Sequence, residues 1–469
     1  MSAPKTIFWF RQDLRLIDNP GFCAAAESGV VLPVYIVEEA AAGEYAMGGA
    51  SRWWLHHALH SLEQELKNTL NFYSGDAFNI LLKLAKAYGI TEIYTNQCYE
   101  PWRIKQEAQL TIQLKEQGIA FYSLEGALLW HPESVLKEDK TPYKVYTPFY
   151  RAAITRGPIP RQPLPVPENI QTVAAATSMT LAELKLLPTH HWCQTLAEFW
   201  EPDNFSALDR LELFIENSLY GYGSQRDYLD NAALSHLSPA LHFGQISSNQ
   251  VWYAIKAQTR SQDTEQFLRQ LIWREFSYYW LYHFPELPHK NFQPKFDVFP
   301  WQHNPEWLKA WQQGQTGYPV IDAGMRELWQ TGYMHNRVRM LVASFLVKNL
   351  MIHWHYGAAW FWDCLCDADL ANNSAGWQWV AGSGMDASPY FRIFNPITQG
   401  EKFDSEGHYT RYFVPELEKL PEKYLFKPWE APEEVLKAAG VILGKTYPLP
   451  IVDFAASREK ALAAYKKIK

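Results

Sequence analysis

The sequence lacks long hydrophobic runs, a signal peptide and a set of paired cysteines. No apolar stretch approaches the length that spans a bilayer, and the N-terminal MSAPKTIFWF has no apolar core ending in a cleavage site. We therefore expect a cytoplasmic protein without a membrane partner. The five cysteines are odd in number and scattered, and Cys364 and Cys366 have no histidine ligands nearby. Neither a disulfide framework nor a metal site is predicted.

The sequence also lacks an excess of positive charge. Its formal net charge is −7, which does not indicate a nucleic-acid binder, although a basic patch on one face can coexist with an acidic total. Aromatic residues are abundant instead, at 15% of the 469 residues with 20 tryptophans. Two explanations are open at this point: a large helical core, or aromatic rings that serve stacking or electron transfer.

The first part of the chain alternates short β-rich runs with amphipathic helical segments. The expected strands are Thr6–Phe10, Val30–Val37, Leu70–Ser74, Glu92–Asn96 and Ala120–Leu124, and the expected helices are Ser51–Lys67, Phe78–Tyr88 and Arg103–Gln117. This alternation predicts an α/β, Rossmann-like domain with a doubly wound parallel sheet. Ser51 is the expected N-cap of its helix, and Gly89 and Gly118 stand where helix-ending glycines belong. No GxGxxG motif follows the first strand, so a dinucleotide phosphate is not expected there.

A proline-rich stretch at 157–169 can continue neither a strand nor a helix. We expect an α/β domain over 1–156, a linker across the surface over 157–201, and a larger all-α domain over 202–469. Helical periodicity dominates this last part, for example in Thr264–His283, Ala323–Gln330 and Arg339–Asn349, and a lysine-rich helix is expected near Arg458–Lys469.

The segment DADLANNSAGWQW, Asp367–Trp379, combines carboxylates, carboxamides and indoles in the most aromatic part of the chain. Asp369 stands two residues after Asp367 and four before Asn373. On a helix or turn, a carboxylate and an amide can therefore face one bound heterocycle. Considered alone, the segment is more typical of a helix cap and a turn, where Asp and Asn are common. The polar, aromatic segments around it favour a ligand site.

Four other parts of the helical half carry candidate functional side chains: Tyr222–Asp227 with Ala233–Gly244, Gln270–Phe276, Gly317–Met340 and Ser388–Pro396. Ser235 and Ser238, with a proline after them, indicate a helix start, where free N–H groups and hydroxyls can hold a phosphate. Gln270 and Trp273 lie three residues apart and so share a helical face. An ordinary capped helix is an open alternative for both segments.

The third of these segments places an amide and a thioether together. Asn336 and Met340 lie four residues apart and so share one helical face. Arg337 and Arg339 then point elsewhere, and one of them can meet a carboxylate such as Asp367. A buried Arg–Asp pair with a purely structural role is the alternative.

Together these segments resemble the photolyase/cryptochrome family, and most of all the bacterial class I photolyases that act on cyclobutane pyrimidine dimers. The resemblance covers most of the chain. It is carried by FWFRQDLRLIDN (Phe8–Asn19), YKVYTPF (Tyr143–Phe149), GYPVIDAGMR, GYMHNRVRM, ASFLVKNL and DADL…GWQW, in this order. It implies a Rossmann-like N-terminal domain and a helical C-terminal domain that holds FAD, in agreement with the architecture expected above.

The matching positions imply a role for each site residue. The FAD phosphates and ribityl chain would be held by Tyr222, Ser235, Leu237 and Ser238. The isoalloxazine would be surrounded by Arg339, Asp367, Asp369 and Asn373, with the Asn373 amide beside N5. Electrons would pass between flavin and surface along Trp377, Trp354 and Trp301. The flipped lesion would contact Gln270, Trp273, Asn336, Met340 and Trp379, and DNA phosphates would lie near Arg226, Arg337 and Arg392. The expected catalytic residues are Asn373, Gln270, Asn336 and Met340.

The resemblance implies light-driven electron transfer from reduced FAD to a dimer in UV-damaged DNA, followed by splitting of the cyclobutane ring and return of the electron. No general acid or nucleophile is required, which agrees with a site of amides, indoles and a thioether. The dimer must be flipped out of the duplex. We expect a monomer. A second, antenna chromophore, folate or deazaflavin, is an open question because YEPWRIKQE (Tyr99–Glu107) matches neither pattern fully.

Two positions depart from the family's dimer-repair enzymes. Gln270 replaces a glutamate, so it keeps a hydrogen bond but supplies no acidity, and Leu234 replaces a threonine near the FAD phosphates. Glutamine at this position is a habit of (6-4) photolyases and animal-type cryptochromes. The (6-4) reaction requires two histidines four apart, where this chain has Asn336 and Met340, so we consider it the less favoured option. A cryptochrome-like photoreceptor is the main alternative; Gln270 favours it, and the lack of a long C-terminal tail disfavours it.

Overall fold

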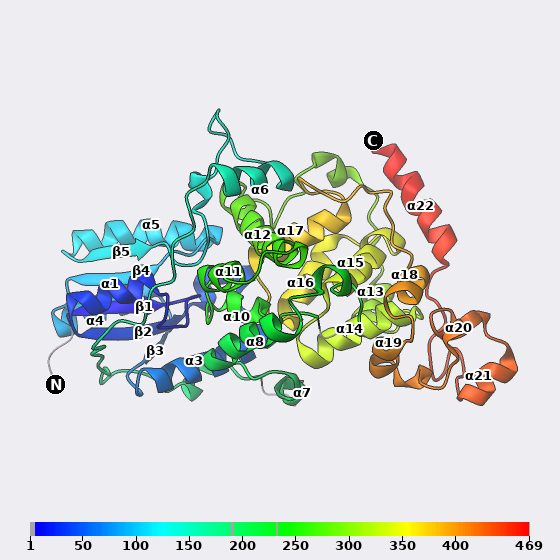
Figure 1. The fold of residues 1–469 in the computed structure, drawn as a ribbon, viewed down its shortest axis with the longest axis horizontal. Helices are drawn as coiled ribbons and strands as arrows, with labels where there is room; N and C mark the ends of the chain where they lie inside the picture. The colour runs from blue at the N-terminus through cyan, green and yellow to red at the C-terminus, as the bar shows by residue number, and fades with distance from the viewer. Residues whose placement is uncertain (1–4, 189–191, 231–232, 469) are drawn as a thin grey trace.

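The computed structural model describes residues 5–188, 192–230 and 233–468, and Figure 1 shows an α/β part at one end and a larger helical part that continues to the C-terminus. The first part contains β1 (Thr6–Phe10), α1 (Pro20–Ser28), β2 (Val31–Val37), α2 (Glu39–Ala42), α3 (Gly49–Glu65), β3 (Asn71–Ser74), α4 (Ala77–Tyr88), β4 (Glu92–Asn96), α5 (Pro101–Glu116), β5 (Ala120–Leu124) and α6 (Tyr146–Thr155). The second contains α7 (Trp192–Phe199), α8 (Asn204–Asn217), α9 (Tyr222–Gln225), α10 (Ser238–His242), α11 (Ser248–Lys256), α12 (Gln262–His283), α13 (Pro305–Gln312), α14 (Pro319–Thr331), α15 (Asn336–Ser344), α16 (Trp354–Cys364), α17 (Leu370–Ala381), α18 (Pro396–Phe403), α19 (His408–Phe413), α20 (Glu422–Leu425), α21 (Glu433–Ala439) and α22 (Phe454–Lys467).

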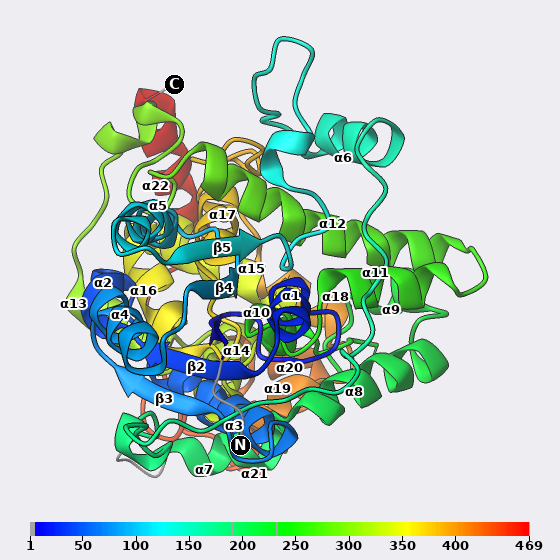
Figure 2. The same ribbon diagram turned by 90° about the vertical axis from the view of Figure 1, so that its left-hand side faces the viewer.

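Five parallel strands form one sheet in the order β3-β2-β1-β4-β5, with helices on both of its faces (Figure 2). Successive side chains of β1 point to opposite faces. Phe8 and Phe10 pack in a cluster with α1 and α3, whereas Ile7 and Trp9 pack in one with α4 and α5. Burial on both faces explains why the strands are continuous apolar runs. The doubly wound parallel sheet predicted from the sequence is confirmed, and the strand bounds agree within one residue.

The three predicted helices of the α/β part are present as α3, α4 and α5, and each begins and ends within two residues of the prediction. Gly89 and Gly118 follow α4 and α5 with φ of 65° and 74°, in the left-handed region that favours glycine. The prediction of Ser51 as an N-cap is wrong, because α3 begins at Gly49. The Ser51 hydroxyl lies inside that helix and donates to the carbonyl of Leu365 at 3.1 Å. It therefore joins the α/β part to the helical part.

In the helical part, the segment expected as one helix over Arg339–Asn349 is made of two pieces. α15 begins earlier, at Asn336, and its N-cap is His335, whose ring accepts from the backbone N–H of Arg337 at 3.1 Å. A π-helical stretch, Phe345–Asn349, follows it. The predicted C-terminal helix is present as α22, and its expected last residue, Lys469, lies outside the described residues.

The segment expected as a surface linker over 157–201 is more structured than predicted. Thr172 forms a β-bridge with Val31 and Met179 one with Phe72, so the segment lies along the β3 side of the sheet and covers it. Ala175 in this segment is buried in the same cluster as α4 and α5. The boundaries at 156 and 201 stay a prediction; α6, which they assign to the first domain, packs in one core cluster with α8, α11 and α12.

The two parts approach each other closely. Gly244 has φ of 69°, and a Cβ there would lie 2.1 Å from the carbonyl oxygen of Gln12. Arg15 donates to the Gly244 carbonyl at 2.7 Å, and the Trp54 indole donates to Gln245 at 2.7 Å. The α/β part therefore packs against the Gly244–Gln245 loop of the helical part and forms hydrogen bonds with it. Of the helices in the described ranges, none is long and apolar enough to cross a membrane.

Candidate functional site

Many of the predicted site residues lie on α9, α12, α15 and α17, whereas Ser235, Leu237 and Asp367 lie in loops. α12 packs against α9 and α17, and α15 also packs against α17. α17 begins after Asp369, whose carboxylate accepts from the backbone N–H of Asn372 at 2.7 Å. Side chains from α12 and α15, which are far from α17 in the sequence, therefore lie close to α17.

The centre of the site is an ion pair between Arg339 and Asp367. Nη1 and Nη2 of Arg339 donate to the two carboxylate oxygens at 3.1 and 2.9 Å, and the Ser238 hydroxyl donates to Oδ2 at 2.5 Å. The guanidinium also lies over the Tyr333 ring, 5.3 Å from its centroid. Burial alone would lower the pKa of Arg339, but the attraction of Asp367 raises it. The pair that the sequence suggested is present, and the arginine that forms it is Arg339.

Asp369 is held by contacts within the protein. One oxygen caps α17, and the other accepts from the Tyr278 hydroxyl and lies 3.6 Å from Nδ1 of His242. Burial would raise the pKa of Asp369. The neighbouring His242, the charge of Arg274 and the Tyr278 hydroxyl outweigh burial and lower this pKa to about 2. Asp369 therefore stays ionised and fixes the start of α17.

This shift predicts a loss of stability in acid. Because the pKa of Asp369 is about 2 in the folded chain and 3.8 ordinarily, its contribution is complete above about pH 4 and is lost as the pH falls towards 2. The contribution amounts to about 2 kcal/mol. Asp369→Asn preserves a helix cap but removes the charge. In this variant, the free energy of unfolding, measured by denaturant titration at several pH values, should depend less on pH between about 4 and 2. An unchanged pH dependence would contradict the role given to the carboxylate.

The residues predicted near the FAD phosphates lie on α9 and in the loop before α10. Tyr222 and Leu237 are buried, Ser235 is half-buried and the Ser238 side chain is exposed, although Pro239 next to it is buried. The loop thus anchors itself through its apolar side chains, and Ser238, the first residue of α10, donates its hydroxyl proton to Asp367. Hydroxyls at the start of a helix are suited to an anion.

The predicted lesion contacts are held by stacking and by one shared helical face. Nδ2 of Asn336 lies 3.9 Å from Sδ of Met340, as the spacing of four residues predicts. The Trp273 ring is stacked on Tyr146, with ring centroids 3.8 Å apart and planes at 6°. The Gln270 amide donates within its own helix, to the Gln266 carbonyl at 3.4 Å.

The other two predicted site residues on α17 have different surroundings. Nδ2 of Asn373 donates to the Ala358 carbonyl of α16 at 3.0 Å, which joins the two helices and orients the amide. Trp379 is half-buried, and its carbonyl accepts from the Ser388 N–H at 3.0 Å. That bond ties the Ser388–Pro396 segment to the end of the site helix.

Two of the three predicted phosphate-binding arginines share one carboxylate. Arg337 lies 2.5 Å from Asp227 and stacks on Phe403 at 3.8 Å, and Arg226 lies 3.9 Å from the same Asp227. Asp227 therefore orients both cations. Arg392 is not gathered with them. Its side chain is exposed, and it forms no ion pair within the part of the chain that the structure describes.

Of the three predicted electron-transfer tryptophans, only the one expected nearest the surface is appreciably exposed. Trp377 and Trp354 are 3% and 1% exposed, and Trp301 is half-buried. The Trp377 ring packs so closely on Gly357 of α16 that a Cβ there would lie 2.1 Å from it. The His353 ring lies between the other two, 5.6 Å from Trp354 and 5.0 Å from Trp301. The electron path along these three tryptophans stays a prediction.

Several residues of the site were not singled out from the sequence. They are Tyr146, Asp227, His242, Tyr278 and Tyr333. Tyr146, Asp227, His242 and Tyr333 lie inside segments considered in the sequence analysis, but the partners of the first three are distant in sequence. Contacts of this kind have no periodic signal, so only the folded structure pairs them.

The crevice where the strand order reverses, between β1 and β4, is filled by protein side chains. Arg11 is buried there and pairs with Glu107 at 2.8 Å, and Asp13 accepts from the Asn96 amide at 2.6 Å. In open α/β sheets this crevice is the usual nucleotide site. Ion pairs occupy it here, which explains in physical terms why no phosphate motif follows β1.

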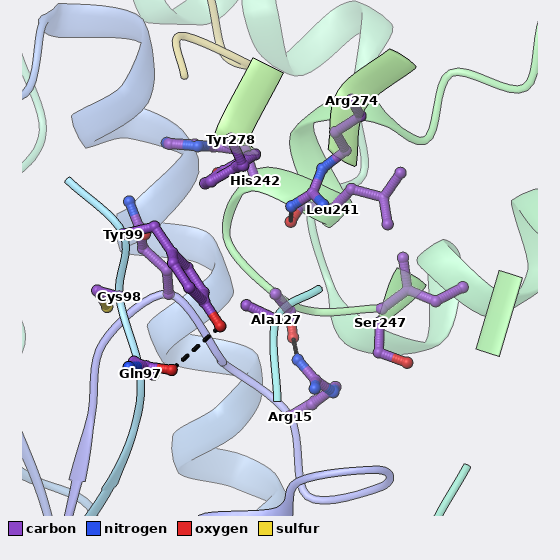
Figure 3. Close-up of a pocket in the computed structure, with 13 residues that line it drawn as sticks. Arg15, Gln97, Cys98, Tyr99, Ala127, Leu241, His242, Ser247, Arg274 and Tyr278 are labelled. Atoms are coloured by element: carbon purple, nitrogen blue, oxygen red, sulfur yellow. Dashed lines mark hydrogen bonds between the residues drawn. The ribbon is translucent and has the colours of Figure 1, made fainter. Parts of the chain in front are cut away.

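A small cavity lies between the two parts, beside Tyr278 and His242 (Figure 3). Its volume of about 10 Å³ is room for one water molecule. Arg15, Tyr99 and Arg274 also line it. An antenna chromophore does not fit in this cavity, so the question of the second chromophore stays open.

Comparison with known proteins identifies the family. Residues 6–168 match the family model described as DNA photolyase, and residues 267–467 match the one described as FAD binding domain of DNA photolyase. The chain belongs to the DNA photolyase and cryptochrome family. A deoxyribodipyrimidine photo-lyase of Agrobacterium fabrum is 49% identical over 100% of this chain and 98% of its own length. Cryptochrome-2 of Arabidopsis thaliana is 36% identical over 97% of this chain and 78% of its own.

A solved photolyase has the same fold. The crystal structure of a bacterial class III photolyase from Agrobacterium tumefaciens superposes with a TM-score of 0.95 at 48% identity, over 100% of this chain and 98% of that one. The prediction of a photolyase-type flavoenzyme with an α/β domain, a helical domain and FAD as cofactor is confirmed. The motifs suggested class I, whereas this relative is titled class III, so the subclass stays a prediction.

Proposed function

We propose that this photolyase-family protein repairs cyclobutane pyrimidine dimers in UV-damaged DNA, driven by light. The observation that carries the proposal is the pairing of an amide and a thioether, Asn336 and Met340, on one face of α15 whose neighbouring helix α17 carries Asn373. Such a site has no general acid or nucleophile and suits electron transfer. As predictions of the same proposal, the protein acts as a monomer in the cytoplasm.

The donor set fits FAD. The half-buried Ser235 hydroxyl can donate to a phosphate oxygen, the Ser238 hydroxyl holds Asp367 in place, and the fixed charges of Arg339 and Asp367 suit a polar heterocycle. Tyr222, Leu237, Asp369 and Asn373 would complete the cofactor site. Reduced FAD, when bound and excited by near-UV or blue light, supplies the electron that opens the cyclobutane ring and takes it back.

The protein's own side chains would bind and position the damaged DNA. Trp273, already stacked on Tyr146, offers a flat apolar wall, and Met340 offers a polarisable one. Asn336 can donate to a base carbonyl. Arg226 and Arg337 supply positive charge for the backbone, which makes binding dependent on salt, while recognition of damage resides in the pocket.

The structure does not favour repair of (6-4) photoproducts. The histidine next to Asn336 in the sequence, His335, is 4% exposed, and its Nδ1 is engaged in capping α15. Burial lowers its pKa to about 4, so it is neutral at physiological pH. A neutral, capping ring is poorly suited to give a proton to a lesion on the opposite side of the helix start.

The direct test is a light-dependent repair assay with the photoreduced holoprotein. Oligonucleotides that contain one cyclobutane dimer should be restored under blue light and not in the dark, whereas (6-4) oligonucleotides should not be restored. If the protein binds the lesion and its FAD is reduced normally but no repair follows, the proposal is wrong and a cryptochrome-like photoreceptor is favoured. The 36% identity to cryptochrome-2 is the reason for naming this alternative.

Gln270 offers a more specific prediction. Among the described residues its amide donates to a carbonyl of its own helix, so Gln270→Glu should fold normally and add a carboxyl that can share a proton with the reduced lesion. We expect the repair yield per absorbed photon to rise or stay equal. A clear decrease would mean that Gln270 serves a different substrate geometry. Gln266→Glu, one turn earlier on α12, is the matched control and should leave the yield unchanged.

A further inference from the structure

A lysine is buried beyond the end of the helix that begins at Asn336. Lys348 lies in the π-helical stretch Phe345–Asn349 that follows α15, and the whole residue is 0% exposed. Within the described ranges it forms no ion pair with a carboxylate, and burial together with the charge of Arg392 lowers the pKa of Lys348 to about 7. Burying an unpaired ammonium group destabilises a fold, and methionine would fill similar space without this cost. Packing alone therefore does not explain a lysine at this position.

The amine of Lys348 holds the backbone of the Ser388–Pro396 segment. Its Nζ donates to the Arg392 carbonyl at 2.8 Å. One turn earlier, the Ser344 hydroxyl accepts from the Phe394 backbone N–H at 3.4 Å. Both bonds are made to the main chain of the segment, so they fix the course of its backbone.

The segment has one side chain anchored in the protein, followed by two that face outwards. Tyr390 is 2% exposed; its ring centroid lies 5.3 Å from Nζ of Lys348 and 4.6 Å from the ring centroid of Tyr465 on α22. Phe391 is 66% exposed, and the Arg392 side chain is also exposed. Because the backbone is held at Arg392, the hold determines where these two exposed side chains lie.

The residues that hold the segment continue a row of side chains proposed to meet the lesion. At intervals of four residues, the row consists of Asn336, Met340, Ser344 and Lys348. Side chains four apart lie on one side of a helix. The row changes to a π-helical turn at its end, and such turns are rare and frequent at functional sites. One continuous helical segment therefore carries the proposed lesion contacts at its start and holds a second exposed segment at its end.

We propose that Lys348 is a positioning residue for the binding of damaged DNA. Through the Arg392 carbonyl it keeps Phe391 and Arg392 at a fixed distance from Asn336 and Met340, so that both groups contact the DNA together. Lys348 does not touch the DNA, since it is fully buried. The inference rests on the proposed function, because it requires that the face of Asn336 and Met340 meets the dimer.

Lys348→Met tests this role, because methionine is apolar and similar in length but donates no hydrogen bond. The full chain should bind an oligonucleotide with one cyclobutane dimer roughly tenfold more weakly, as measured by fluorescence anisotropy. Its thermal midpoint should stay equal or rise, since a buried charge is removed. Hydrogen exchange of the Ser388–Pro396 amides should be faster in the DNA-free variant. A lysine that serves only the fold would give the opposite result, a lower midpoint with unchanged affinity.

Two further variants complete the test. Ser344→Ala removes the second bond to the segment and should weaken dimer binding about threefold. Lys83→Met, at an exposed position of α4, removes the same charge and should leave the affinity unchanged. Unchanged dimer affinity in Lys348→Met or Ser344→Ala, or an equal loss in Lys83→Met, would overturn the inference. If the wild-type chain binds dimer-containing and undamaged oligonucleotides equally, the proposed function is wrong, and this inference with it.

Discussion

Asp367→Asn should release FAD from the protein. Arg339 would remain in place with its charge and lose its bidentate partner, and Ser238 would lose its anionic acceptor. Breaking a buried ion pair costs about 3–5 kcal/mol, and we expect the lower end because the Arg339 side chain is 25% exposed. If that loss falls on the cofactor site, FAD affinity decreases roughly 100-fold. A fluorescence titration of the FAD-free variant measures it.

The control for this substitution is an ion pair on the surface. Glu265 pairs with Arg260 at 2.6 Å, and both side chains are exposed to solvent. Glu265→Gln should change neither FAD affinity nor stability by more than about 1 kcal/mol. Stoichiometric FAD in purified Asp367→Asn, with a lowered thermal midpoint only, would show that the Arg339–Asp367 pair serves the fold and not the cofactor.

Trp377→Phe should abolish most of the light-driven reduction of the bound flavin while leaving repair by chemically reduced enzyme intact. Trp377 is 3% exposed and packs against Gly357, one turn from Trp354 on α16. Phenylalanine preserves most of the packing but is a much poorer electron donor than an indole, so photoreduction should fall by an order of magnitude or more. Spectra recorded during illumination with an external reductant report the rate.

Trp311→Phe separates packing from electron transfer. Trp311 is fully buried, its ring lies 6.2 Å from that of Trp377, and its indole donates to the Val342 carbonyl at 2.9 Å. This variant should be less stable and still photoreduce its flavin at a normal rate. Equal loss in both variants would indicate disturbed packing, and normal photoreduction in Trp377→Phe would exclude this path.

Sequence patterns predicted the parts of the fold that depend on local periodicity. The strands of the sheet are apolar on both faces and are bounded by turns, so each was located within one residue. The shared face of Asn336 and Met340 follows from helical spacing alone. The family motifs supplied the cofactor, because an FAD site built from scattered hydroxyls and one ion pair has no periodic signature.

Contacts between distant segments could not be predicted in this way. From helical spacing alone, either Arg337 or Arg339 could pair with Asp367. In the structure, Arg339 pairs with Asp367 and Arg337 pairs with Asp227. Ser51 was expected to cap a helix, but a tertiary bond to Leu365 uses its hydroxyl. In each case the competing partners are similar in chemistry, and three-dimensional packing decides between them.

The central claim is that the protein holds reduced flavin directly beside the dimer. Fluorescence lifetime of the reduced holoprotein tests it, with saturating oligonucleotide that does or does not contain one cyclobutane dimer. We predict a clearly shorter lifetime with the dimer, because transfer to the lesion competes with emission, and no change with undamaged DNA. An unchanged lifetime at proven saturation by the dimer would contradict the claim.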